Sequence, residues 1–209
     1  MEFTDKQVQI IETAERLFAE RGFDGTSVRD IADEAGINVA MISYYFGSKE
    51  KLMEALFELR IGSVKIRVES LLKDESLSPI EKVNMLIDEH IERVMQKQPF
   101  FKIMLGVQVT NKNPALLKAA NNIKIRNAEV VSELIKDGQK KGVFKKKIDV
   151  ILMLNTMVGT VSQCMMSQQY YREFNNQLDM PDEEFLVIIK RRLSIHIKTL
   201  FKAILTNEA

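Results

Sequence analysis

The segment from residue 27 to residue 51 constrains what this chain can fold into more than any other stretch. Its pattern predicts two short helices joined by a turn at residues 36–38, and a third helix that begins at Ser48. Ser27 and Asp30 have the spacing of a capping box at the start of the first helix, and Gly36 is well placed to end it. Two short helices on such a turn form a helix-turn-helix, which can insert its second helix into the major groove of DNA.

The helix expected at residues 39–46 has an apolar side and an uncharged opposite side. With about 100° between successive residues, its inward stripe consists of Val39, Ile42, Tyr45 and Phe46. Its outward side consists of Ala40 and Tyr44, flanked by Met41 and Ser43. A helix that only meets solvent normally carries lysine or glutamate there, whereas small and hydroxyl-bearing side chains can approach base pairs and bind base edges or phosphates. The pattern therefore predicts a helix that reads the groove.

Two cations flank this pair of helices. Arg29 lies in the first turn of the first helix, where its guanidinium can reach a base edge or a phosphate. Lys49 lies in the first turn of the helix that follows Ser48, where a cation opposes the helix dipole. A DNA phosphate would remove this penalty, because the helix N-terminus and the lysine both attract it. We therefore expect Lys49 to bind the DNA backbone.

The charge of residues 1–49 argues in the opposite direction. They contain five basic and nine acidic side chains, whereas DNA-binding domains are usually basic. Six of the acidic residues lie in or beside the expected first helix, which can face away from DNA, and residues 36–48 contain none. We therefore favour DNA binding over the alternative, a three-helix unit with a purely structural role.

The runs from Phe18 to Ala32 and from Tyr44 to Leu52 resemble the DNA-binding domain of the TetR family of transcriptional regulators. The motif covers about the first quarter of the chain, and the remainder is similar to that family in its length and all-helical pattern. Ser43 stands where many family members have a tyrosine. The resemblance implies DNA contacts by Arg29, Val39, Ala40, Met41, Ser43, Tyr44 and Lys49, and phosphate contacts by Thr26, Ser27 and Tyr45.

The composition of the whole chain indicates an all-α fold. Of its 209 residues 45% are apolar, only four are prolines, and no segment alternates in the manner of a strand. We expect about nine helices, in a helix-turn-helix domain at 1–50 and a larger helical-bundle domain at 51–209 that binds a ligand and dimerises. A net charge of +1 excludes DNA binding by bulk charge alone. The single Cys164 and an N-terminus unlike a signal peptide favour the cytoplasm.

The segment from Val150 to Tyr171 carries no formal charge and is long enough to span a bilayer. Its eight polar side chains argue against membrane insertion and for a soluble helix that is buried on more than one side. We expect helices at about 148–174 and 182–206 to meet their copies across a two-fold axis, as TetR-like proteins do. Two helix-turn-helix units about 34–36 Å apart would then bind a palindromic operator.

Methionine and aromatic residues on the central helices suggest a ligand pocket. Methionine adapts to irregular apolar surfaces, which suits the binding of greasy ligands. Methionines at helical spacing also simply fill a core, and both interpretations stay open here. The candidate pocket residues are Phe100, Phe101, Met104, Met153, Met157, Met165 and Tyr170.

Residues typical of enzymes and metal sites are scarce. His90 and His196 are the only histidines, Cys164 lies within an expected helix, and no glycine-rich phosphate loop occurs. We therefore expect no catalysis, no metal and no cofactor. The basic stretch 112–147 fits a solvated face better than a contact with DNA or an acidic partner.

These patterns favour a homodimeric regulator of transcription that binds double-stranded DNA, and more specifically a repressor that a small hydrophobic effector releases from its operator. Two alternatives stay open. One is a helical-bundle enzyme or carrier whose N-terminal domain is only structural. The other is a DNA-binding protein that recruits a protein partner through residues 112–147 and needs no small molecule.

Overall fold

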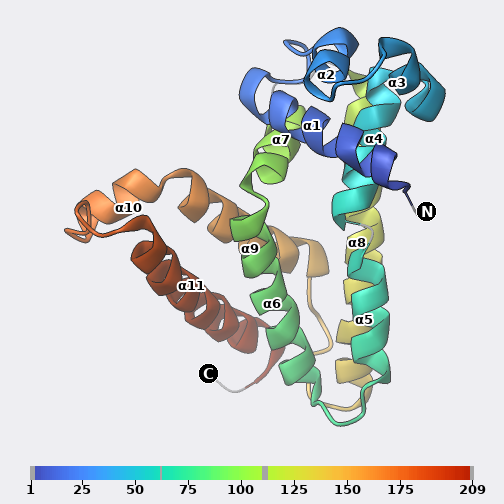
Figure 1. Ribbon diagram of the computed structural model, residues 1–209. Coiled ribbons are helices and arrows are strands. Elements are labelled where there is room, and N and C mark those ends of the chain that lie inside the picture. The colour runs from blue at the N-terminus through green and yellow to red at the C-terminus, as the bar shows by residue number, and fades with distance from the viewer. Residues whose placement is uncertain (1–2, 62, 110–112, 208–209) are drawn as a thin grey trace. The chain divides into compact units, whose positions relative to one another are not determined.

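The computed structural model describes residues 3–61, 63–109 and 113–207, and these fold into eleven α-helices with no strand (Figure 1). The all-α prediction is thereby confirmed. In chain order the helices are α1 (Asp5–Arg21), α2 (Val28–Glu34), α3 (Val39–Phe46), α4 (Lys49–Ile61), α5 (Ser63–Lys73), α6 (Pro79–Gln96), α7 (Gln98–Val109), α8 (Pro114–Lys140), α9 (Val150–Met166), α10 (Gln168–Phe174) and α11 (Asp182–Leu205).

One of the expected helices is divided. The helix expected from residue 48 to about 72 corresponds to α4 and α5, which lie on either side of residue 62, a residue outside the described part of the chain. The expected helix 148–174 is bent by 77° between α9 and α10, so the prediction of one continuous helix was wrong. The bend lies at Ser167, whose backbone leaves the helical region (φ −110°, ψ 38°). Its hydroxyl donates to Gln163 O at 2.7 Å, a bond that commonly accompanies helix bending.

Within the described residues no single helix is long and apolar enough to cross a membrane. α9 and α10 meet the requirements of length and composition only when they are taken together, across their bend.

The described residues form two compact units that are interleaved along the chain. The first contains the chain up to Ile66 and then Pro99–Asn127, and the second contains Arg67–Gln98 and continues from Ala128. The first unit is larger than the expected 1–50 domain because α4, α7 and the first half of α8 belong to it. α8 is a single helix that runs from the first unit into the second.

The core of the first unit joins α1–α4 with α7 and the start of α8 (Figure 1). Ile42 of α3 and Leu116 of α8 belong to one cluster of buried side chains. The rings of Phe57 in α4 and Phe100 in α7 meet edge to face with 6.1 Å between their centroids. A fully buried large apolar side chain contributes about 1.5–3 kcal/mol to stability. The segment 99–127 therefore stabilises the helix-turn-helix, although it follows it by more than fifty residues in the sequence.

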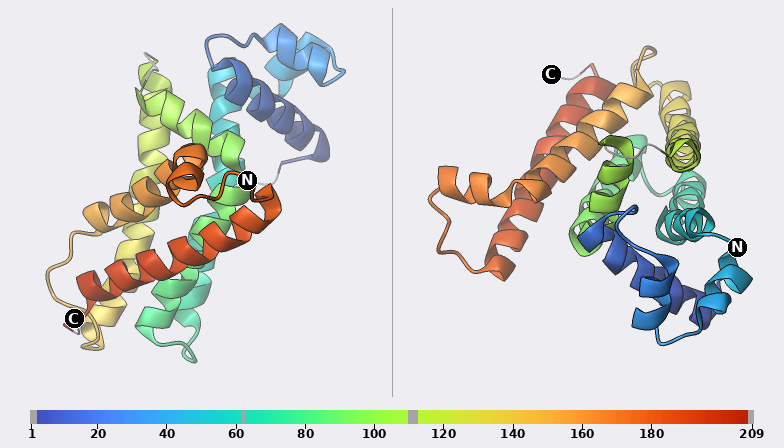
Figure 2. Two further views of the ribbon diagram at one scale, coloured as in Figure 1. Left: turned by 90° about the vertical axis from the view of Figure 1, so that its left-hand side faces the viewer. Right: turned by 90° about the horizontal axis from the view of Figure 1, so that it is seen from above.

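In the second unit α6 packs against α9 and α11, which lie side by side (Figure 2). Ser78 and Glu81 form a capping box at the start of α6, and Pro79 occupies its first turn. The hydroxyl of Ser194 in α11 donates to the carboxylate of Asp88 in α6 at 2.6 Å. The buried stripe of α11 recurs at every fourth residue and consists of Phe185, Ile189, Leu193, Ile197, Phe201 and Leu205.

Candidate DNA-binding surface

A buried threonine ties the start of α2 to the end of α1. Thr26 is 1% exposed, and its hydroxyl lies 2.9 Å from Gly22 O and 3.2 Å from Leu17 O. The single hydroxyl proton is shared by these two carbonyls. The hydroxyl thus points into the domain and helps to position α2, and the phosphate contact that the resemblance implied for Thr26 stays a prediction.

The capping box at the start of α2 is present as predicted. Ser27 Oγ accepts a hydrogen bond from the Asp30 amide at 3.1 Å, and Asp30 Oδ2 accepts one from the Ser27 amide at 2.7 Å. These bonds to Ser27 hold the pKa of the Asp30 carboxyl below its ordinary value. Arg29 is exposed in the same turn, and among the described residues no ion pair or side-chain hydrogen bond engages it. Its guanidinium is therefore available to a ligand.

The turn between α2 and α3 has the backbone that its sequence predicts. Gly36 adopts φ 63°, in the left-handed region that favours glycine. The Ile37 amide donates to Ala32 O at 3.0 Å, and this bond ties the turn to the end of α2. Asn38 Oδ1 then caps α3 by accepting from the Ala40 amide at 2.9 Å. These bonds fix where α3 begins relative to α2.

The inward side of α3 packs into the first unit. Ile42 is 1% exposed, and Tyr45 and Phe46 are half-buried against the same core. Val39 departs from the predicted inward stripe, because 40% of it is exposed. Val39 is the first residue of α3, at the edge of the packed side of the helix.

The outward side of α3 is open and carries no charge. Tyr44 is 82% exposed, and its ring meets the ring of Tyr45 at 5.1 Å in an edge contact. Ala40 and Ser43 are exposed, and Met41 is half-buried. An exposed phenol beside a hydroxyl and a methyl group offers hydrogen bonds and apolar contacts at once, the two kinds of group that base edges recognise.

Lys49 stands at the start of α4, yet its ammonium faces the domain. Nζ donates to Phe23 O and Thr26 O, both at 2.9 Å, and lies 4.2 Å from the centre of the Phe23 ring. The carbonyl oxygens and the ring face stabilise the cation that the helix dipole disfavours. These contacts all lie within the domain, and the contact of Lys49 with the DNA backbone stays a prediction.

An arginine that the sequence analysis did not single out neutralises part of the acidic α1. Arg60 of α4 forms an ion pair with Glu15, which is only 6% exposed, and another with Glu12 at 3.3 Å. Burial opposes the charged form of Arg60, but its bonds with the two glutamates raise its pKa overall. The negative charge of residues 1–49 is therefore reduced by a residue outside that range.

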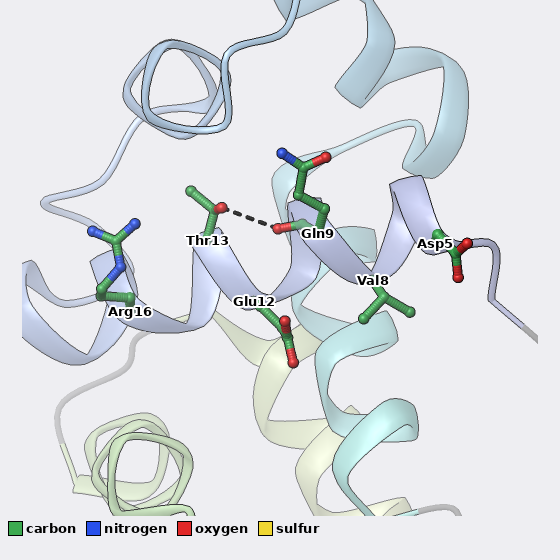
Figure 3. Close-up of a pocket in the computed structure, with 6 residues that line it drawn as sticks. All are labelled: Asp5, Val8, Gln9, Glu12, Thr13 and Arg16. Atoms are coloured by element: carbon green, nitrogen blue, oxygen red, sulfur yellow. Dashed lines mark hydrogen bonds between the residues drawn. The ribbon is translucent and has the colours of Figure 1, made fainter.

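An open hollow of about 430 Å³ lies beside α1. Figure 3 shows the side chains that line it. Thr13 donates to Gln9 O at 3.0 Å, and Gln9 Nε2 donates to Ala35 O at 3.2 Å. Arg16 pairs with Glu34 at 2.9 Å. Most of the polar side chains around the hollow are therefore engaged within the first unit. Its lining residues are Asp5, Val8, Gln9, Glu12, Thr13 and Arg16.

The seven candidate pocket residues are divided between the two units. Three of them belong to α7 and pack in or against the core of the first unit: Phe100, Phe101 and Met104. Three lie on the buried side of α9 in the second unit: Met153, Met157 and Met165. The seventh, Tyr170, is 69% exposed. Neither unit contains all seven candidate residues, because α7 belongs to the core of the first unit and α9 to the second unit. A pocket lined by all of them stays a prediction.

Fold and surface together define the class of protein: an all-helical chain whose α2–turn–α3 has the form of a DNA-binding helix-turn-helix. Residues 10–56 match the family model described as bacterial regulatory proteins, tetR family. Residues 57–200 match the model described as YsiA-like protein, C-terminal region. The chain belongs to the TetR family of bacterial transcriptional regulators.

Relatives of known description agree with this assignment. The fatty acid metabolism regulator protein of Bacillus subtilis is 26% identical over 158 residues, which cover 76% of this chain and 80% of that protein. The transcriptional repressor KstR2 of Mycolicibacterium smegmatis is 28% identical over 148 residues, 69% of this chain and 70% of that one. The structure of FadR from Bacillus subtilis in complex with stearoyl-CoA aligns with a TM-score of 0.67 at 23% identity, over 91% of this chain and 96% of that chain.

Proposed function

We propose that this chain is a homodimeric transcriptional repressor that binds a palindromic operator through α3 and leaves it when a hydrophobic effector binds. One observation carries the DNA-binding part. The outward side of α3 is uncharged, with Tyr44 82% exposed, while Ile42 on the inward side is 1% exposed and fixes the helix in place. In this proposal Arg29, Val39, Ala40, Met41, Ser43 and Tyr44 face the bases, and Ser27, Tyr45 and Lys49 face phosphates.

Dimerisation is part of the proposal because one helix-turn-helix makes too few contacts for a specific site. The second unit offers a surface for it, since the outward sides of α9 and α11 expose large apolar residues. Two copies joined there would present two α3 helices to successive major grooves on one side of the duplex. In this proposal the protein acts in the cytoplasm, where a chromosomal operator would lie.

The effector is proposed to be a lipid-like molecule, with long-chain acyl-CoA as the first class to test. A structural neighbour was solved with stearoyl-CoA, and a relative is described as a regulator of fatty acid metabolism. Repression is favoured because KstR2 is described as a repressor. An effector regulates only if its affinity differs between the DNA-bound and released states.

α8 is the element best suited to couple the two units. Leu116, Ala120 and Ile123 near its start are buried in the core beneath the helix-turn-helix. Arg126 of α8 forms an ion pair with Glu58 of α4 at 2.9 Å. The same helix continues into the second unit as far as Lys140. A ligand that displaced the second half of α8 would therefore strain the packing under α3.

The effector part is tested by fluorescence anisotropy on an operator fragment that the protein itself selects from genomic DNA. Addition of stearoyl-CoA is expected to release the fragment, while coenzyme A without an acyl chain leaves it bound. Retention of the fragment across a panel of acyl-CoA thioesters and steroids would contradict a lipid-like effector without affecting the DNA-binding part.

A further inference from the structure

The chain turns back on α8 directly after that helix ends (Figure 1). Gly142 adopts φ 73°, in the left-handed region that favours glycine. The amides of Val143 and Phe144 both donate to Gly138 O, at 2.9 and 3.2 Å. The Phe144 ring is 5% exposed and lies so close to Gly138 that a Cβ at this glycine would overlap it. The segment that leads to α9 therefore begins packed against the last turns of α8.

Hydrogen bonds from two sides hold the backbone of this segment in place. Gln139 Nε2 of α8 donates to Lys145 O at 2.8 Å and to Lys146 O at 3.1 Å. The Lys145 amide donates to Leu205 O at 2.7 Å, and Lys145 Nζ donates to Ala203 O at 2.9 Å, near the end of α11. The segment is thus bonded both to α8 and to α11. A ligand that bound there would not have to order a loose chain first.

An open hollow of about 730 Å³ lies between α8 and this segment, and all of its lining belongs to the second unit. Lys136 of α8 and the neighbouring Lys146 and Lys147 line it, and all three are exposed. Among the described residues no ion pair or side-chain hydrogen bond engages their ammonium groups. The carboxylate of the lining, Asp149, caps α9 by accepting from the Leu152 amide at 3.0 Å. Three cations against one carboxylate leave the lining with a net positive charge.

Between the lysines the wall of the hollow is apolar. Ile135 of α8 is 2% exposed, Ile148 and Val150 are half-buried, and Ile151 is 54% exposed. Small-molecule sites commonly have volumes of about 300–1,000 Å³ and combine an apolar wall with a few charged groups that orient the ligand. Lysine binds phosphate groups as a compact point charge. The lining therefore matches a molecule that carries phosphate charges on an apolar body.

We propose that this hollow binds a soluble phosphorylated molecule of the nucleotide class, with the phosphates at the lysines and the base against the isoleucines. None of the seven candidate pocket residues lines the hollow, so it is a second site. A purely ionic ligand would leave the apolar wall in water, and a neutral one would leave the lysines without counter-charge. The concave shape favours a small molecule over a bilayer surface. The proposal is independent of the proposed function, since neither DNA nor the effector takes part in it.

Isothermal titration calorimetry with adenosine triphosphate at low ionic strength, without divalent cations, tests the site. Lys146→Gln with Lys147→Gln is expected to weaken binding about tenfold or more, because two of the three cations around the hollow are lost. Addition of about 0.5 M salt is expected to weaken binding to the original protein, since exposed charges are screened. Absence of binding to the original protein at millimolar adenosine triphosphate would overturn the proposal.

The matched control is Lys140→Gln with Lys141→Gln, which makes the same change in net charge in the same basic stretch. Both lysines are exposed and lie outside the lining of the hollow. This variant is expected to keep its affinity for adenosine triphosphate within about twofold of the original. Equal losses in the two double variants would show attraction by bulk charge and would refute the site. Far-ultraviolet circular dichroism establishes that each variant is folded.

Two further probes separate the apolar contribution and the source of the phosphate. Inorganic tripolyphosphate has the phosphates of adenosine triphosphate without the nucleoside, and it is expected to bind about tenfold more weakly because it leaves the apolar wall uncovered. Equal affinity of the two would refute the nucleotide class. Vesicles of phosphatidylglycerol are expected to leave the protein in the supernatant after centrifugation. Sedimentation with these vesicles that Lys146→Gln with Lys147→Gln abolished would assign the hollow to lipid headgroups and overturn a soluble ligand.

Discussion

The ammonium of Lys49, the first residue of α4, donates a hydrogen bond at 2.9 Å to the carbonyl oxygen of Thr26, which lies just before α2. It makes a second bond of the same length to Phe23 O. The hydroxyl of the same Thr26 reaches back to α1 at Gly22 O. The loop between α1 and α2 is therefore bonded both to the end of α1 and to α4. These bonds help to fix the positions of α2 and α3. Residues that family resemblance assigns to the DNA backbone here also build the support of α3.

Lys49→Met is expected to lower the free energy of unfolding by about 1–2 kcal/mol, because charge-assisted hydrogen bonds are lost while the aliphatic stem remains. Urea denaturation measures this change. Lys51→Met is the matched control, since Lys51 lies two residues further along α4 and its ammonium pairs with Glu54 at the surface. Exposed pairs contribute less than about 1 kcal/mol. Equal losses in the two variants would show that the bonds to Phe23 and Thr26 have no structural role.

Thr26→Val is expected to cost about 1–2 kcal/mol of stability, since it removes the hydrogen bonds of a buried hydroxyl to Leu17 O and Gly22 O. The folded variant should bind DNA with unchanged salt dependence, because the hydroxyl faces α1 and not solvent. Denaturation and a salt titration of DNA affinity measure the two quantities. A salt slope that fell by about one unit would instead support a phosphate contact.

Tyr44→Ala is expected to abolish specific DNA binding while changing the free energy of unfolding by less than about 0.5 kcal/mol, the usual range for exposed positions. Its neighbour Tyr45 gives the contrasting case. Tyr45→Ala removes a ring packed against the core and is expected to destabilise the first unit clearly. Electrophoretic mobility shift and thermal denaturation of both variants check this. Retention of full operator affinity by Tyr44→Ala would mean that α3 reads DNA with another side.

Stability is expected to fall as the pH drops from about 6.5 towards 4 because of one histidine. Burial, assisted by the nearby charge of Arg93, lowers the pKa of His90 from 6.5 to about 4. In that window the unfolded chain binds a proton that the folded chain does not, so acidification favours unfolding. His90→Gln should show a smaller loss of stability between pH 7 and pH 5 than the original protein. His196→Gln, at an exposed position of α11, is the control and should keep the original pH dependence.

The helix-turn-helix could be predicted from the sequence because its determinants are local. The capping pair of Ser27 and Asp30 and the left-handed Gly36 act within a few residues of one another, and the structure has each as expected. The apolar period of 39–46 likewise placed Ile42 inside and Tyr44 outside. Only Val39, at the edge of its helix, is more exposed than the period indicated.

The partners of these elements could not be predicted, because they depend on contacts between distant segments. The spacing of apolar residues in α7 marks Phe100 and Met104 as buried but does not say which helices they face, and they proved to belong to the core of the first unit. Arg60 and Glu15 are 45 positions apart, so no pattern linked them. The bend at Ser167 was also missed, since neither proline nor glycine marks it.

The most direct test of the account is selection of genomic fragments by the purified protein, followed by sequencing, with Tyr44→Ala carried in parallel. The account predicts one enriched near-palindrome whose half-sites lie about one helical turn of DNA, or a multiple of it, apart. It also predicts that this sequence is absent from the fragments that Tyr44→Ala retains. No enriched palindrome, or the same palindrome recovered by Tyr44→Ala, would contradict the claim that α3 reads the operator.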